Sequence, residues 1–142
     1  MRIAIAAPSP VPFVLGGAEN VWLGLQRFIN GESRHECELI KLPVREGSLA
    51  ELIDAYAAFA RLDVGAFDTV ISGKYPAWMT QHRNHRLYML HTLRGLYDTY
   101  HLMGEPTEVA WPASLRPLVG TMDRLAAAER ADNDGILDCL AA

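Results

Sequence analysis

The stretch that most constrains this chain is residues 1–31, which read as a buried strand, a stiff loop and an amphipathic helix. Residues 2–7 form a short run with no polar residue inside it, as expected for a strand covered on both faces. The three prolines of residues 8–12 lack an amide donor, so we expect strand pairing to stop at the first of them. Gly16 and Gly17 then allow backbone conformations that a Cβ would forbid. Because a helix start carries unpaired N–H groups and a partial positive charge, this loop is a candidate phosphate site.

The composition limits the classes of protein to which the chain can belong. Its 142 residues suit a single domain with a real core, and half of them are hydrophobic, which is typical of a globular protein. The formal net charge of −4 leaves no surplus of Lys and Arg to neutralise phosphates, which argues against nucleic-acid binding. No apolar run approaches the roughly 20 residues that a membrane span needs, and the N-terminus has no signal-peptide pattern.

Two cysteines bear on the compartment. Cys37 and Cys139 are too few and too far apart for a disulfide framework or a zinc site, and a small buried hydrophobe is the simplest interpretation of each. We therefore expect a reducing, cytoplasmic compartment.

Hydrophobic periodicity predicts alternating strands and helices in the first part of the chain. Asn30 and Gly31 form a conventional helix stop, Ser48 and Glu51 have the spacing of a capping box, and Gly73 breaks the third strand. The expected elements are a helix over 18–30, a strand over 37–44, a helix over 49–62, and strands over 69–72 and 86–91. This order predicts an α/β fold with a Rossmann-like, doubly wound parallel sheet.

Beyond Thr92 the alternation stops. Residues 93–103 read as a loop leading into a short helix, and residues 117–130 are helical in composition. Residues 136–142 begin another helix whose apolar side chains need cover, and no strand follows. We interpret the chain as one domain of a longer, two-domain polypeptide with a helical C-terminal segment.

Three segments follow strand ends, where open parallel sheets bind their ligands. They are residues 8–17, 73–75 and 91–94. If the first and fourth strands are neighbours, one crevice would collect a glycine pair, two cations and an imidazole, a set that suits a phosphorylated ligand. The residues concerned are Gly16, Gly17, Lys74, His91 and Arg94.

Each candidate also has a purely structural interpretation. A glycine pair before a helix is often a tight turn, and Lys74 and Arg94 have the character of solvated surface charges. His91 ends an apolar strand, where a core histidine would also fit. Glu19 lies in the first helical turn and meets the helix dipole favourably, a role that competes with a ligand contact. Residues 74–78 (KYPAW) could stack a ring, although aromatic residues near strand ends more often close a core.

Several familiar sites are excluded by the residues. The first loop has neither the G-x-G-x-x-G of dinucleotide-binding folds nor a G-x-x-x-x-G-K-[ST] phosphate loop. No serine lies in a G-x-S-x-G elbow, so no hydrolase nucleophile is visible. His82 and His85 fit no strong metal motif, and no carboxylate accompanies them, so we expect no metal site there.

The residues resemble the N-terminal domain of family 4 (group 1) glycosyltransferases. The resemblance rests on the leading strand, the proline-containing loop, the helix opening Gly16 to Glu19 (GGAE), the segment 67–71 (FDTVI), and His91 closing a later strand. It covers roughly residues 1–98, while the residues that follow match no general motif of that family.

The resemblance implies a GT-B architecture, in which two Rossmann-like domains face each other across a cleft. The implied reaction is retaining transfer of a sugar from a nucleotide-sugar donor to a glycan or lipid-linked acceptor, without a required metal or other cofactor. His91 would then take the catalytic, sugar-proximal position. The residues expected to bind substrate are Gly16, Gly17, Glu19, Lys74 and Arg94.

The same resemblance assigns the donor-gripping residues to a C-terminal domain that this sequence does not contain. We therefore expect the isolated chain to be inactive. The apolar residues 11–15 could contact a membrane surface or a lipid-linked acceptor. We expect this loop instead to fold back onto the domain.

Two other functions stay open. One is a stand-alone module that binds a nucleotide or phosphorylated metabolite without catalysis. The other is a regulatory or protein-interaction domain with an empty crevice.

Overall fold

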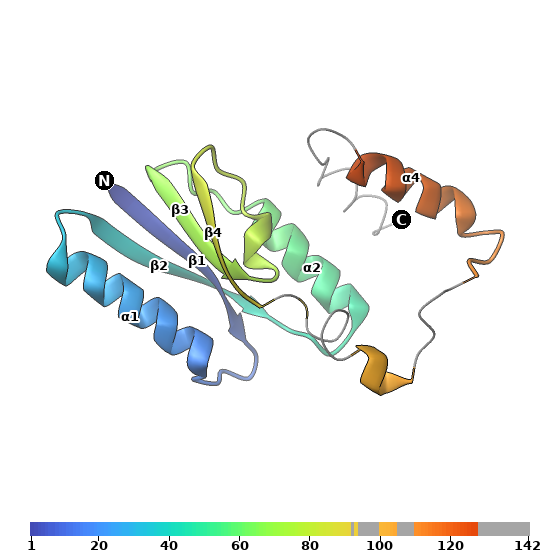
Figure 1. Cartoon of the computed structure of the whole chain (residues 1–142), viewed down its shortest axis with the longest axis horizontal. Helices are drawn as coiled ribbons and strands as arrows, with labels where there is room; N and C mark the ends of the chain where they lie inside the picture. Colours follow the sequence, from blue (N-terminus) through green and yellow to red (C-terminus); the bar gives the residue numbers. More distant parts are fainter. Residues whose placement is uncertain (92, 94–99, 105–109, 128–142) are drawn as a thin grey trace. The chain divides into compact units, whose positions relative to one another are not determined.

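The computed structural model describes residues 1–91, 93, 100–104 and 110–127, and the chain divides into two compact units, residues 1–92 and 93–142. The first unit contains a parallel sheet and two α-helices, and the described part of the second is helical (Figure 1). The elements of the first unit are β1 (Arg2–Pro10), α1 (Gly17–Glu32), β2 (Glu36–Val44), α2 (Leu49–Ala60), β3 (Thr69–Lys74), the 3₁₀ turn η1 (Ala77–Met79) and β4 (His85–His91). The second unit contains η2 (Tyr100–Met103) and α4 (Arg116–Ala126).

The sheet has the strand order β2-β1-β3-β4, and all three strand pairs are parallel. The predicted parallel α/β sheet is therefore confirmed. The first and fourth strands, whose pairing was the condition for a shared crevice, are not neighbours, because β3 lies between β1 and β4. β2 is added on one side of β1, and β3 is added on the opposite side of β1. The strand order therefore reverses between β1 and β3, which is the topological switch point.

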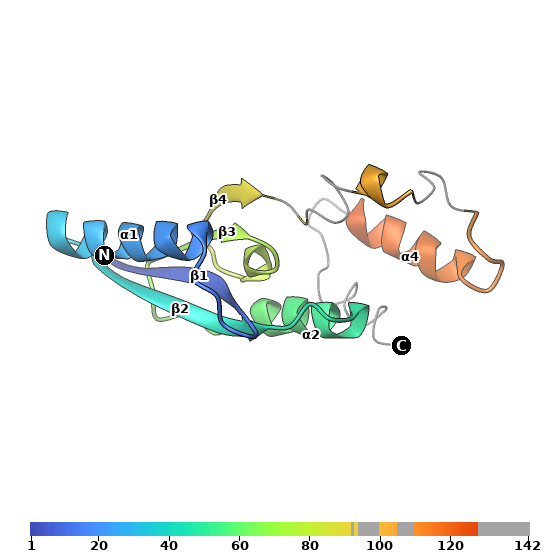
Figure 2. The same cartoon turned by 90° about the horizontal axis from the view of Figure 1, so that it is seen from below.

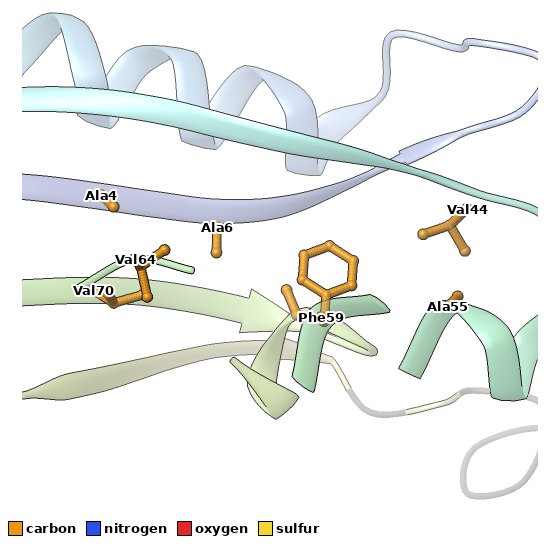
Figure 3. Packing of buried hydrophobic residues seen from close by; sticks show 8 residues of the cluster. Ala4, Ala6, Val44, Ala55, Phe59, Val64 and Val70 are labelled. Carbon is orange, nitrogen blue, oxygen red and sulfur yellow. The ribbon is translucent and has the colours of Figure 1, made fainter. Parts of the chain in front are cut away.

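Helices cover both faces of the sheet, as Figure 2 shows for α1 and α2. Successive side chains of a strand point to opposite faces, and in β1 this alternation feeds two separate cores. Ile3, Ile5 and Ala7 pack on the α1 side with Trp22. Ala4 and Ala6 face α2, where a second cluster includes Phe59 and Val70 (Figure 3). The expectation that the first strand is covered on both faces is confirmed.

β1 continues past the point where proline was expected to stop it. Its pairing with β2 runs to Pro10, whereas its pairing with β3 ends at Ala6. The amide of Val11 donates to the Val44 carbonyl at 3.1 Å, so by alternation the nitrogens of Pro8 and Pro10 face away from β2. Proline is tolerated there because that side of β1 has no strand partner.

α1 also runs further than predicted, through Gly31 to Glu32. The Asn30 side chain does not end the helix but clamps it to β2. Its Oδ1 accepts from the Cys37 amide at 2.7 Å, and its Nδ2 donates to the Cys37 carbonyl at 2.9 Å. This contact holds the end of the helix at β2, so the Asn-Gly pair is not the stop.

The predicted cap of the second helix is present in altered form. Ser48 Oγ accepts from the Glu51 amide at 3.2 Å, while the Glu51 carboxylate accepts from the Gly47 amide at 3.1 Å. The helix ends at Ala60, two residues before the predicted end.

Gly73 does not break the third strand but lies inside it, buried. A Cβ at this position would overlap the ring of Trp22 and crowd the Tyr88 carbonyl. Glycine is present here because an aromatic ring of α1 crosses the backbone, and not because the chain turns. The chain turns after Lys74 and returns to β4 through η1.

The described helix of the second unit, α4, starts within one residue of the prediction. None of its side chains is buried. The helix ends at Ala126, with Ala127 as its C-cap, so the predicted end at residue 130 is wrong. The helix predicted over 136–142 and Cys139 lie outside the described residues. Within the described part of the chain, no helix is long and apolar enough to cross a membrane.

Candidate functional site at the carboxyl edge of the sheet

The glycine pair before α1 has ordinary backbone geometry. Gly16 caps the helix in an extended conformation, with φ −122° and ψ −171°. Among the described glycines only Gly104 has a positive φ, so Gly16 and Gly17 do not use the conformational freedom that glycine allows. A Cβ on Gly17 would meet no atom within 4 Å. The space beside Gly17 is therefore open.

Glu19 holds the start of α1 in place. Its side chain is buried, and its Oε2 accepts from the Gly16 amide at 3.0 Å. One of the two amides expected to cradle a phosphate is therefore already bonded to a carboxylate of the protein. The structural role considered for Glu19 is present, and no described contact tests its ligand role.

Lys74 and His91 lie beside each other at the carboxyl edge. They are register partners at the ends of β3 and β4, and the end of β1 is next to β3 at the switch point. The loop of residues 11–16, Lys74 and His91 thus belong to one edge, although β3 separates the first and fourth strands. Among the described residues, no carboxylate forms an ion pair with Lys74. Arg94 lies outside the described residues.

Four rings gather next to this edge, on the α2 side of the sheet. The ring of Tyr75 lies edge-on to His91, with centroids 6.1 Å apart, and Trp78 lies 6.2 Å from Tyr75 and 6.4 Å from Tyr56. All four side chains are partly buried. We call Tyr56, Tyr75, Trp78 and His91 the aromatic cluster.

A carboxylate joins this cluster through Tyr75. Burial raises the pKa of the Tyr75 phenol to about 12, and the charge of Glu46 and its hydrogen bond with the phenol act in the same direction. Glu46 follows β2 and is exposed. The contact links the segments after β2 and β3.

Sequence reasoning found His91 and the 74–78 run but missed Tyr56 and Glu46. Tyr56 falls on the apolar stripe of its helix, where periodicity indicates only core packing. Glu46 falls in a polar turn, where no local pattern distinguishes it from a solvated charge. Only the three-dimensional return of β3 beside β1 brings these residues to Tyr75.

The loop of residues 11–15 is exposed, so the expectation that it folds back onto the domain is wrong. Phe13, Val14 and Leu15 are 59–62% exposed. The Lys41 ammonium lies 4.9 Å from the centre of the Phe13 ring, a favourable contact between a cation and an aromatic face. The loop therefore presents apolar side chains to solvent near the carboxyl edge.

Two histidines, His82 before β4 and His85 at its first residue, serve the fold. His82 Nε2 lies 3.1 Å from the Phe67 carbonyl, and its Nδ1 accepts from the Asn84 amide. His85 Nε2 lies 2.6 Å from the Ser72 hydroxyl, which is fully buried. Within the part of the chain that the structure describes, no three His, Cys, Asp or Glu side chains are grouped to hold a metal ion.

Comparisons of the chain with protein-family models, with curated proteins and with solved structures found no match.

Proposed function

We propose that this chain is the acceptor-side, N-terminal domain of a retaining glycosyltransferase of the GT-B type, which moves a sugar from a nucleotide-sugar donor to an acceptor. One observation carries the proposal. The strand order β2-β1-β3-β4 brings the start of α1, Lys74 and His91 to the carboxyl edge at which parallel sheets bind ligands. A second Rossmann-like domain, which grips the nucleotide, completes the cleft in this proposal.

The residues have distinct roles under this proposal. The Lys74 ammonium, with no carboxylate paired to it among the described residues, neutralises donor phosphate charge. The open space at Gly17 admits the donor to the start of α1. His91 lies near the transferred sugar, and Glu19 fixes the loop through Gly16. Arg94 is a further candidate for phosphate binding.

The test uses the complete protein encoded by the gene, screened for sugar transfer from a panel of nucleoside diphosphate sugars to glycan and lipid-linked acceptors. Lys74→Ala should lower kcat/KM by about 10- to 100-fold, because a charged contact to the donor is lost. Arg27→Ala, an exposed cation on α1, is the matched control and should leave kcat/KM unchanged. Equal activity of Lys74→Ala and Arg27→Ala would contradict the role of Lys74.

Gly17 provides an independent test of the loop. Because a Cβ at Gly17 meets nothing within 4 Å, Gly17→Ala should fold normally, so reduced donor binding would report on the ligand and not on the fold. Unchanged donor binding by this variant would make the loop merely structural. The proposal as a whole is wrong if the complete protein transfers no sugar from any donor of the panel.

The absence of a carboxylate paired to Lys74 also favours a second candidate, a nucleotide- or phosphometabolite-binding module without catalysis. Titration of the chain with nucleoside diphosphates, followed by NMR shifts of the Gly17 amide, separates the two candidates. Saturable binding by a protein that transfers no sugar supports the binding module.

A further inference from the structure

The run after β3 has two different parts. Pro76 and Ala77 are buried, and Ala77 belongs to the core on the α2 side of the sheet. Tyr75 and Trp78, on either side of them, are only partly buried and meet Tyr56 and His91. The middle of the run thus closes the core, whereas its two rings are left at the surface.

The rings of the aromatic cluster are not stacked parallel. The planes of Tyr75 and Trp78 make an angle of 56°, and those of Tyr56 and Trp78 an angle of 70°. They therefore form no parallel-walled slot of the kind that would hold a flat base between two faces. Tilted ring faces instead suit a ligand with C–H groups pointing in several directions, such as a sugar ring.

Polar groups border these rings. The exposed Glu46 carboxylate is close enough to the Tyr75 phenol for its charge to help raise the phenol pKa. An ionised carboxylate has about four acceptor sites, which a ligand with hydroxyl groups can use. A phosphate would be repelled by the same charge. An apolar surface with a few convergent polar groups is the usual composition of a small-molecule site.

We propose that the aromatic cluster, together with Glu46, binds the ring of a neutral sugar. The C–H face of the sugar packs on Trp78 and Tyr75, and its hydroxyls donate to the Glu46 carboxylate. This binding rests on the chemistry of the cluster alone. The identification of that sugar as the acceptor rests on the proposed function.

The experiment is saturation-transfer difference NMR on the 142-residue chain with the methyl glycosides of glucose, galactose, mannose and N-acetylglucosamine. At least one glycoside should receive saturation, and Trp78→Ala should weaken its binding by about tenfold, because the main packing surface is removed. Glu46→Gln and Tyr75→Phe should each weaken it by about threefold, since each removes a polar partner while keeping the volume of the side chain.

Trp111→Ala is the matched control, because Trp111 is an exposed tryptophan of the second unit. This variant should bind the glycoside like the parent chain. Circular dichroism checks that each variant is folded, and if Trp78→Ala is not folded the decision falls to Glu46→Gln and Tyr75→Phe.

Two results would overturn the proposal: no saturation of any glycoside, or binding that Glu46→Gln and Tyr75→Phe leave unchanged. Its failure is distinct from that of the proposed function. Sugar binding at the cluster in a complete protein that transfers no sugar would uphold the site and refute the transferase. Suppose instead that the chain binds no glycoside and that transfer activity survives Glu46→Gln and Tyr75→Phe. This result would uphold the transferase and refute the sugar site at the aromatic cluster.

Discussion

The absence of a side chain at Gly73 allows α1 to pack closely on the sheet. The Trp22 ring occupies the space into which a Cβ would project, and the Tyr88 carbonyl closes the other side. Trp22 is itself almost fully buried, and its indole N–H has no hydrogen-bond partner among the residues that the structure describes. The ring is therefore held by packing and has little room to move.

We expect Gly73→Ala to lower the free energy of unfolding by about 3 kcal/mol or more, because neither ring nor backbone can yield without disturbing the core. Urea denaturation followed by circular dichroism measures the change.

Gly24→Ala is the matched control, because Gly24 lies inside α1 with no atom within 4 Å of the added methyl group. It should raise the stability by about 0.5–1 kcal/mol, the usual gain of alanine over glycine in a helix. Similar effects of the two substitutions would show that the Trp22 contact does not constrain position 73.

The sequence could not distinguish these glycines. Gly16 and Gly17 stand in a pair before a helix, and this local pattern allows special backbone geometry that the structure does not use at either residue. Gly73 reads locally as a strand breaker, but its constraint comes from a ring far away in the sequence. Local patterns record local conformation, whereas a steric requirement of this kind depends on the fold.

At the scale of elements, Asn30 joins α1 to β2. We expect Asn30→Ala to destabilise the protein by about 1–3 kcal/mol, because the amide and the carbonyl of Cys37 both lose a side-chain partner. Thermal unfolding of the variant measures this loss. Asn20→Ala, an exposed asparagine of the same helix, should change the stability by no more than about 0.5 kcal/mol. A loss as large in Asn20→Ala would show that the effect is not specific to the clamp.

The contact between β3 and β4 should depend on pH. The pKa of His85 is lowered by burial and then by the charge of His82, against a smaller opposing effect of a hydrogen bond to the Thr80 backbone. A histidine whose pKa is lower in the folded state than in the unfolded state contributes stability above its ordinary value near 6.5. That contribution should be lost as the pH falls below 6.5.

The measurement is the free energy of unfolding from pH 8 to pH 5, for the parent chain and for His85→Gln, which keeps a side chain able to bond to Ser72. The decline toward acid pH should be shallower in the variant. Identical slopes would show that His85 does not couple protonation to folding.

The existence of the elements could be predicted from the sequence far better than their ends. The capping residue Ser48 starts its helix as expected, because capping is decided within one turn of chain. Pro8 and Gly31 failed as stop signals for a different reason. Pro8 is tolerated because β3 no longer pairs with β1 at that position. The end of α1 is held by the bond from Asn30 to β2. Both effects depend on neighbouring strands, about which a local sequence pattern carries no information.

At the scale of the whole molecule, alternation of strands and helices predicted a parallel sheet but not its order. Both orders of β3 and β4 would satisfy the same hydrophobic pattern, because each strand is short and apolar. The candidate site was therefore only partly predictable. Lys74 and His91 were expected at one edge because strand ends meet there, whereas the contact of Tyr75 with Glu46 depends on the position of β3 beside β1.

The distribution of buried residues makes a further prediction about the two units. The two hydrophobic clusters identified in the described residues are drawn from the first unit, and no residue of α4 is buried. A chain ending at residue 92 should therefore unfold cooperatively, with a Tm within about 4 °C of that of the full chain. Loss of the cooperative transition would show that residues 93–142 are needed for the sheet.

The position of β4 at the end of the strand order has a practical consequence for handling the protein. Among the described strands β4 has a neighbour on one side only, and three consecutive apolar residues, Leu87, Tyr88 and Met89, are about half or more exposed. An exposed edge strand of this kind can form backbone hydrogen bonds with a strand of a second chain. Repeated pairing of this kind produces fibrils. Aggregation through this strand should therefore limit the shelf life of concentrated samples. Tyr88→Lys should lengthen that shelf life, because it places a charge where the strands of two copies would pair.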